Sequence, residues 1–200
     1  MRDHFFFPLA ILLLVALVGV ALIPGAGALP TGSVTGDGED YSVITIEGRY
    51  LNKVYAGGDA ITRLEKDALG KRVLYIEAEV GRLSDNPELG PHFKLAGDVE
   101  TQFSGMTIRI TVTAKPAVDG GAENIALNYS AGQAGGSGWK IFPLGSGKTD
   151  ISFEYKVPLV VGDQGNDFLA IRPVVPIKSR ALIVEKIKME RLGPWGQSGS

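Results

Sequence analysis

The chain of 200 residues contains no cysteine. This absence excludes a disulfide scaffold, a thiol nucleophile, a zinc site or iron–sulfur cluster with cysteine ligands, and a lipoprotein acylation site. Histidine is scarce as well, since only His4 and His92 occur, and a site built from several histidines is therefore excluded. Charge of either sign is not in excess, because 20 Lys and Arg face 22 Asp and Glu, a net charge of −2. This balance excludes a nucleic-acid partner held by electrostatics, which requires clustered excess Lys and Arg.

Charged residues are also missing from most of the N-terminal segment. Residues 5–23 form an apolar run that only Pro8 and Gly19 interrupt. A helix of that length spans roughly 28 Å, close to the hydrocarbon thickness of a bilayer. We therefore predict a transmembrane helix within residues 1–24, retained as an anchor in the lipid bilayer. A cleaved signal peptide is the alternative, because residues 26–28 form a small-x-small site.

The charges that flank this run predict its orientation. Arg2 precedes the run, whereas Asp37, Glu39 and Asp40 follow it. By the positive-inside rule the N-terminus lies in the cytoplasm and the rest of the chain outside. We expect a single-pass protein of a bacterial inner membrane with a periplasmic C-terminal domain.

The remainder of the chain is rich in turn residues and in short strand-like runs. Gly 27 and Pro 11 favour a turn-rich β domain over a helical one. We predict a Gly/Pro-rich linker over residues 25–40, a domain over 41–192 and a tail over 193–200. Within the domain only residues 57–69 suggest a helical turn or loop. Strand-like runs, most of which alternate apolar and polar residues, occupy 41–47, 73–80, 106–112, 125–129, 151–157, 168–174 and 182–192.

Alternating strands bury one face and leave the other in water, so two sheets must pack together. The predicted fold is thus all-β, a two-sheet antiparallel β-sandwich behind one transmembrane helix. We expect Ile110, Leu127, Phe153 and Trp139 between the sheets. A change of phase near Glu185 predicts a β-bulge in the last strand.

The second half of the domain resembles a known family. Residues 138–144, 151–158, 167–173 and 182–189 read GWKIFPL, ISFEYKVP, DFLAIRP and LIVEKIKM. They resemble the second half of a jelly-roll carbohydrate-binding module, which is similar to the galactose-binding-like sandwiches. That family typically has a Trp that opens a strand, a Phe-x-Tyr-x-Val-Pro strand and a final apolar strand. The resemblance covers residues 70–192 and implies a jelly-roll fold, with Trp139 as the usually buried tryptophan.

Motifs for catalysis are missing or misplaced. GSGKT at 145–149 lacks the first glycine of a phosphate-binding loop, because Phe142 stands there, and it precedes a strand. We predict a hairpin turn instead. A Ser–His–acid site would need His92, and no Gly-x-Ser-x-Gly elbow occurs. We expect no enzyme and no cofactor.

Two residue groups are candidates for ligand binding. Asp163, Asn166 and Asp167 surround a glycine with oxygen ligands that could hold a structural Ca²⁺, although a polar hairpin loop is the favoured interpretation. Tyr50 and Tyr55 lie near Arg49 and Lys53 and could line a glycan groove.

These observations leave two functions. In the favoured one, the protein is a non-catalytic, membrane-anchored accessory subunit. Its sandwich docks or stabilises a larger integral membrane protein complex, and Trp195 is the partner-binding anchor. A bioenergetic assembly, such as a reaction-centre/light-harvesting or respiratory complex, is the expected class. The alternative is a membrane-anchored glycan-binding module of the cell envelope.

Overall fold

A computed structural model of the chain describes residues 11–14, 29–36, 40–162 and 165–195. The predicted transmembrane segment, residues 5–23, lies largely outside the described residues, although residues 11–14 within it are helical. In the part of the chain that the structure describes, no helix has both the length and the apolar character needed to cross a bilayer. The retained anchor and its orientation stay predictions.

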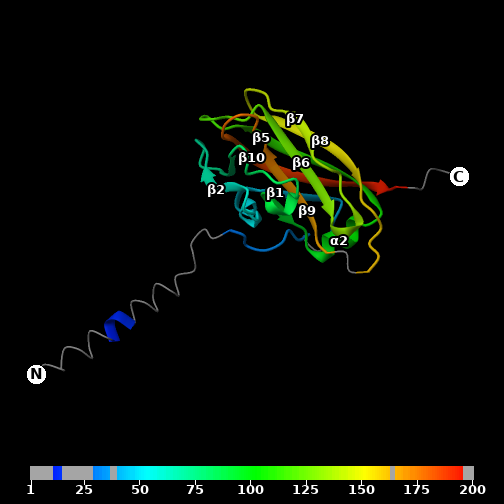
Figure 1. The fold of residues 1–200 in the computed structure, drawn as a ribbon. Helices are drawn as coiled ribbons and strands as arrows, with labels where there is room; N and C mark the ends of the chain where they lie inside the picture. Colours follow the sequence, from blue (N-terminus) through cyan, green and yellow to red (C-terminus); the bar gives the residue numbers. More distant parts are fainter. Residues whose placement is uncertain (1–10, 15–28, 37–39, 163–164, 196–200) are drawn as a thin grey trace, which may run out of the picture.

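Two antiparallel sheets pack face to face (Figure 1). The larger sheet has the order β2-β3-β10-β5-β8, and β1 also pairs with β10; the smaller has the order β4-β9-β6-β7. The predicted two-sheet β-sandwich is therefore confirmed. The strands are β1 (Val43–Glu47), β2 (Ala60–Lys66), β3 (Arg72–Ala78), β4 (His92–Lys94), β5 (Met106–Pro116), β6 (Asn124–Ala131), β7 (Lys140–Pro143), β8 (Thr149–Lys156), β9 (Asp167–Pro173) and β10 (Arg180–Pro194).

The core lies between the sheets, where the sequence alternation placed it. Ile108, Ile110 and Val112 of β5 are fully buried, and so is Leu127 of β6. Phe153 is 8% exposed and stacks on Phe142 at 6.1 Å between ring centres. The prediction for Trp139 is wrong, because this half-buried side chain lies over Arg172 on the outward face of the smaller sheet.

Two other predictions are corrected. Residues 57–69 contain the edge strand β2, which pairs with β3 throughout its length. The strand is hard to recognise in the sequence because its core-facing positions carry only small or partly buried residues, such as Ala60 and Leu64. A short helix, α2 (Gly97–Phe103), was not expected; it buries Val99 and Phe103, four residues apart on one face. The short 3-10 helices are η1 (Gly48–Lys53), η2 (Pro87–Leu89) and η3 (Gly132–Ala134).

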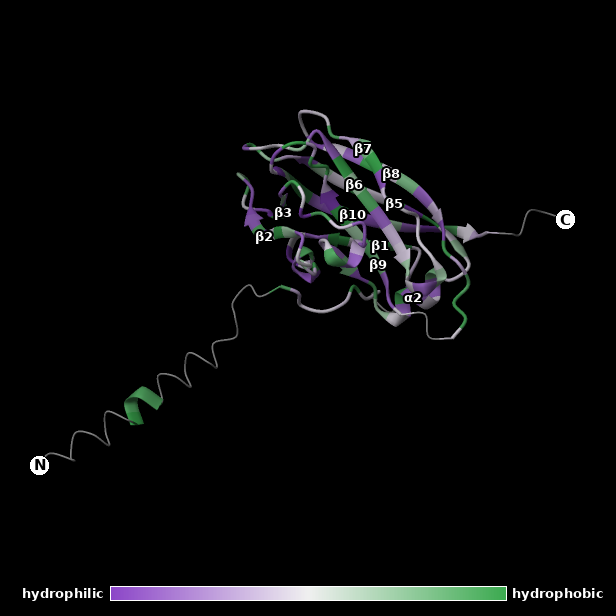
Figure 2. Ribbon diagram, viewed as in Figure 1, coloured by the Kyte–Doolittle hydropathy of each residue, from purple (hydrophilic) through white to green (hydrophobic). Residues whose placement is uncertain are grey.

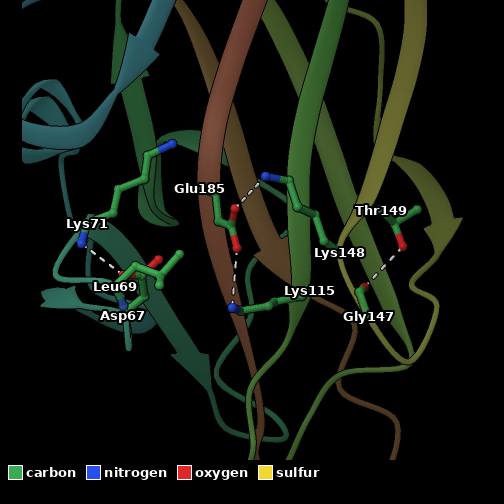
Figure 3. A network of polar contacts seen from close by, with 8 residues as sticks. All are labelled: Asp67, Leu69, Lys71, Lys115, Gly147, Lys148, Thr149 and Glu185. Carbon is green, nitrogen blue, oxygen red and sulfur yellow. Dashed lines mark hydrogen bonds and ion pairs between the residues drawn. The ribbon is translucent and has the colours of Figure 1, made fainter.

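The predicted β-bulge in β10 is confirmed, since the register with β5 shifts between Val184 and Lys186. The bulged residue, Glu185, is 7% exposed. Its carboxylate accepts from the ammonium groups of Lys115 at 3.2 Å and Lys148 at 2.8 Å (Figure 3). The hydrogen bond from Lys148 is the main reason that the pKa of this carboxyl lies below its ordinary value. A buried acid is tolerated here because two cations compensate it.

The same contact explains the GSGKT segment. Residues 145–148 connect β7 to β8, and Lys148 of this turn reaches the bulge. The predicted hairpin is wrong, because β7 and β8 belong to different sheets, so the turn crosses from one sheet to the other. The turn is thereby tied to the central strand of the larger sheet (Figure 3).

An extended segment precedes β1 and lies against the sandwich. Val34 is 4% exposed and forms a parallel bridge with Leu95. The backbone N–H of Thr31 donates to the Asn52 carbonyl at 3.1 Å, and the Lys53 ammonium donates to the Ser33 carbonyl at 2.5 Å. We call residues 31–36 the strap; this part of the predicted linker is packed on the domain (Figure 1).

We expect Ile110→Ala to lower the free energy of unfolding by about 2–5 kcal/mol, because it removes buried apolar surface and leaves a cavity. Urea denaturation of the full chain measures this change. Thr111→Ala is the matched control, since Thr111 points outward to the Ser152 hydroxyl at 2.6 Å. An equal effect of the two substitutions would contradict the assigned strand facing.

Candidate functional site

The outward face of the smaller sheet is withdrawn from water along its central strands, β6 and β9. Phe168 and Ala170 of β9 alternate with the core residues Leu169 and Ile171, yet they are only 3% and 0% exposed. An antiparallel sheet in a sandwich ordinarily leaves its outward face solvated. This face is therefore covered, and the groups on it are the candidates for a function.

Three residues form a row across this face. Ala170 pairs with His92 of β4 on one side and with Asn128 of β6 on the other. His92 is 5% exposed and Asn128 is 6% exposed. Among the described residues, neither the His92 Nε2 atom nor the Asn128 Oδ1 atom has a hydrogen-bond partner. Buried polar atoms are nearly always satisfied, so two such atoms flanking one methyl group require an explanation.

The chemistry of the two atoms follows from their surroundings. The His92 Nδ1 atom lies 2.9 Å from the Gly90 carbonyl oxygen, so Nδ1 carries the proton and donates. Burial lowers the pKa of His92 and favours the neutral imidazole. Nε2 is then an acceptor, as is Oδ1 of Asn128. Both atoms lack a donor, which a hydroxyl or N–H group of a ligand can supply.

Aromatic rings surround the imidazole. Tyr55 stacks on His92 with 5.3 Å between ring centres and 11° between planes, and Phe168 lies at 5.3 Å on a tilted plane. Backbone hydrogen bonds of 2.8 Å and 2.9 Å between Tyr55 and His92 fix this stack. The ammonium of Lys94 lies 5.1 Å from the centre of the Tyr55 ring.

The far side of the face carries a second aromatic group. The guanidinium of Arg172 lies 3.8 Å from the centre of the Trp139 ring. The Trp139 indole N–H donates to the Asp85 carbonyl at 3.1 Å, and Arg172 donates to the Ser84 carbonyl. These bonds tie the loop between β3 and β4 to the outward face of the smaller sheet.

A cavity of about 400 Å³ lies between this loop and the sheet. Phe168 forms the part of the cavity wall that lies nearest to His92. The lining offers amides, hydroxyl and backbone groups and one carboxylate, without a cationic side chain: Asn86, Pro87, Glu88, Ser130, Gly132, Gln133, Gly165, Asn166 and Phe168. Such a lining suits a neutral ligand rich in hydroxyl groups.

Asp167 lies beneath this cavity and faces the core. Its carboxylate accepts from the Tyr129 hydroxyl at 2.6 Å, and its N–H donates to a Glu100 carboxylate oxygen at 2.8 Å. The side chain is 4% exposed. The pKa of Asp167 is raised to about 6, mainly by burial; the Tyr129 hydrogen bond lowers it, and the nearby Glu100 charge adds to the increase.

The proposed calcium ligands do not converge. Asp163 lies outside the described residues. Asn166 lines the cavity, whereas the Asp167 carboxylate points to Tyr129. Within the described ranges, no group of three or more His, Cys, Asp or Glu side chains could hold a metal. A calcium site stays a prediction.

The structure also separates the two tyrosines. Tyr55 belongs to the outward face of the smaller sheet, whereas Tyr50 is 46% exposed in a groove beside β1. Trp195 lies elsewhere again: it is 40% exposed, and its indole N–H donates to the Val157 carbonyl.

His92, Asn128 and Phe168 were not singled out as site residues. One signal was present, because residues 168–171 read FLAI without alternation. A continuous apolar run indicates a strand buried on both faces. The pairing of His92 with Asn128 across Ala170 had no sequence signal, since it depends on the strand order.

No family model matches the chain, and no curated protein matches it. Among solved structures it is similar to the CBM22-1 and GH10 modules of endo-1,4-beta-D-xylanase 10B from Clostridium thermocellum, solved with xylohexaose. That likeness has 15% identity and a TM-score of 0.46 and covers 80% of this chain and 28% of that one. It is also similar to the CBM22-2 xylan-binding domain of Paenibacillus barcinonensis Xyn10C, with 11% identity, a TM-score of 0.48 and coverage of 69% and 91%.

A third similar structure is a carbohydrate-binding module of Cellvibrio mixtus lichenase 5A in complex with cellotriose. It has 12% identity and a TM-score of 0.38, and the match covers 73% of this chain and 95% of that one. All three contain carbohydrate-binding modules, the family that the sequence resembles at the level of fold.

The raised pKa of Asp167 predicts a pH-dependent stability. The folded-state pKa is about 6, against an ordinary value of 3.8 for an aspartate, so folding favours the protonated acid. Its stabilising contribution is complete below the unfolded pKa and is lost as the pH rises through 6. Relative to Asp167→Asn, we expect the unmodified protein to lose about 2 kcal/mol of unfolding free energy between about pH 4 and pH 7. Urea denaturation at both pH values measures the difference, and parallel pH profiles of the two proteins would contradict it.

Proposed function

We propose that the sandwich binds a glycan on the outward face of its smaller sheet. The observation that carries this proposal is the pair of buried acceptors, Nε2 of His92 and Oδ1 of Asn128, that lack donors within the described residues. Leaving such atoms unpaired costs about 1–3 kcal/mol each, a cost that a ligand with suitably placed donors removes. Sugar hydroxyl groups are donors of that kind.

Rings next to the acceptors fit the same class of ligand. Tyr55 and Phe168 flank His92 at 5.3 Å each, and the apolar faces of sugar rings pack on aromatic side chains. The cavity beside Phe168 has no cationic side chain in its lining, so we assign a neutral rather than an acidic sugar.

The proposed activity is binding without hydrolysis. Glycosidases use a pair of carboxyl groups that flank the bond to be cleaved. Glu88 is the one carboxylate in the described lining of the cavity, while the Asp167 carboxyl is turned toward Tyr129. We therefore infer a non-catalytic module.

We expect Asn128→Leu to weaken glycan binding roughly tenfold while leaving the protein at least as stable, because it removes an unpaired acceptor. The full chain in mild detergent, applied to an array of neutral and acidic oligosaccharides and then titrated with the best binder, gives the affinities. Thermal unfolding gives the stabilities.

Asn124→Leu at the start of β6 is the matched control, because it makes the same substitution at a half-buried position whose side chain is not among the buried atoms without a partner in the described residues. His92→Phe removes the second acceptor and is expected to act like Asn128→Leu. Unchanged glycan affinity in both variants, or no binding by the unmodified chain, would overturn the proposal.

A second candidate function is the membrane-anchored accessory subunit of a larger complex. The observation that favours it is a stretch of exposed apolar residues, 159–161, in the loop between β8 and β9, which is coloured as hydrophobic in Figure 2. Leu159 is 65% exposed and Val160 45%, and the backbone N–H of Trp195 bonds to the Gly105 carbonyl that lies beside Leu159. Exposed apolar groups around a tryptophan are typical of protein docking sites. In this proposal residues 5–23 anchor the chain in a bacterial inner membrane.

If this surface docks a partner, Trp195→Ala should weaken retention of the co-purifying complex roughly thirtyfold, the loss expected for a tryptophan hot spot. Mild detergent extraction followed by dissociation-rate measurement tests this. Val118→Ser changes an equally apolar side chain, 97% exposed in the loop after β5, and is the control. Equal retention of both variants would exclude docking through Trp195.

A further inference from the structure

A groove of about 400 Å³ lies between the strap and β1, away from the outward face of the smaller sheet. We call it the β1 groove; its lining is Val34, Thr35, Gly36, Val43, Ile44, Thr45, Ile46, Tyr50 and Lys53. Four consecutive residues of β1 contribute, although their side chains alternate between the two faces of the sheet. Consecutive residues can share one wall only where the strand presents its edge, so the wall of the groove is the backbone of β1.

That edge has no strand partner. β1 pairs with β10, and the Arg191 N–H donates to the Ser42 carbonyl at 2.8 Å. Backbone groups alternate in direction along an antiparallel strand, so Ile44 and Ile46 also face β10. The N–H and C=O groups of Val43 and Thr45 then face the groove, and no described residue bonds to them.

The strap forms the opposite wall, and it too presents backbone groups to the groove. The Val34 N–H donates to the Lys94 carbonyl at 2.8 Å, and the Ala96 N–H donates to the Val34 carbonyl at 2.8 Å. Val34 thus directs its backbone away from β1, and the following residue, Thr35, directs its own toward the groove. No described residue bonds to the backbone of Thr35, so among the described residues both walls of the gap offer unpaired backbone groups.

The floor and the rim differ in chemistry. Val34, Ile44 and Ile46 make the floor apolar, with exposures of 4%, 5% and 1%. Arg49 lies over the Tyr50 ring at 4.9 Å, and the Lys53 ammonium bonds to the strap. Neither cation forms an ion pair with a described acidic side chain, since the salt bridges of this region join other residues. The cations therefore lie at the η1 end of the groove, whereas at the other end the Asp98 carboxylate accepts from the N–H of Gly36 at 3.1 Å.

We propose that the β1 groove binds an extended acidic peptide segment, which adds a strand between the strap and β1. Backbone hydrogen bonds to Val43, Thr45 and Thr35 supply affinity, as in other cases of strand addition. Alternate side chains of the peptide face the apolar floor, and the ones between them place carboxylates beside Arg49 and Lys53. A polypeptide fits better than a sugar because both walls are unpaired backbone.

The probe is a short fluorescent peptide that alternates valine and glutamate, titrated with the full chain in mild detergent and followed by fluorescence anisotropy. We expect saturable binding, and about tenfold weaker binding by the double variant Arg49→Gln, Lys53→Gln, since two exposed ion pairs are lost. Thr45→Pro removes a groove-facing N–H and is expected to abolish binding. An edge strand tolerates proline where its N–H faces outward.

Thr45→Val keeps the N–H and is the matched control, with thermal unfolding to verify that each variant is folded. The same peptide with N-methylated valines, and a valine–lysine peptide, are expected not to bind. No binding of the acidic peptide, equal binding of either control peptide, or displacement by an oligosaccharide would overturn the proposal. The proposal would also be overturned if the chain self-associates and Thr45→Pro abolishes this self-association, because the occupant of the groove would then be a second copy of the chain. Asn128→Leu should leave peptide binding unchanged, so the outcome is independent of the proposed glycan function.

Discussion

Hydrogen bonding to β10 is the constraint on which the larger sheet depends. This strand pairs with β5 along one edge, and with β3 and β1 in succession along the other. The bulge at Glu185 lies between the segment paired with β3 and the segment paired with β1. Two lysines neutralise the buried carboxylate, and one of them holds the turn before β8. Because β1 is confined to the end of β10, its other edge is left to the strap and the β1 groove.

The smaller sheet is subject to a different constraint, since its two central strands, β6 and β9, are buried on both faces over most of their length. Its inward face packs on the core through residues such as Leu127 and Leu169. Its outward face is covered by the loop that Trp139 and Arg172 hold through the carbonyls of Asp85 and Ser84. Hydrophobic burial alone does not need His92 or Asn128 there, and an apolar pair of similar size would avoid their unpaired atoms. These two buried acceptors are the observation on which the proposed glycan site rests.

The two surfaces differ in the kind of ligand that their unpaired groups select. Side-chain acceptors and rings on the smaller sheet fit hydroxyl groups and the apolar faces of sugars. Backbone groups along the β1 groove fit another backbone, and the cations Arg49 and Lys53 add a preference for acidic side chains. Since they lie on different sheets, a chain that binds a glycan on one surface can dock a polypeptide on the other.

Alternation in the sequence determined the fold class, because a period of two in segments such as 106–112 and 151–157 dictates which side chains are buried. It also located the bulge at Glu185, where the phase changes. Tertiary structure alone decided the rest. Trp139 is placed outward because its position continues the outward row of β7. Strand order places His92 and Asn128, 36 positions apart in the chain, on opposite sides of Ala170. Periodicity specifies the face of a residue within its own strand, whereas sites arise from neighbours on other strands, and the pairing of strands is a property of the whole chain.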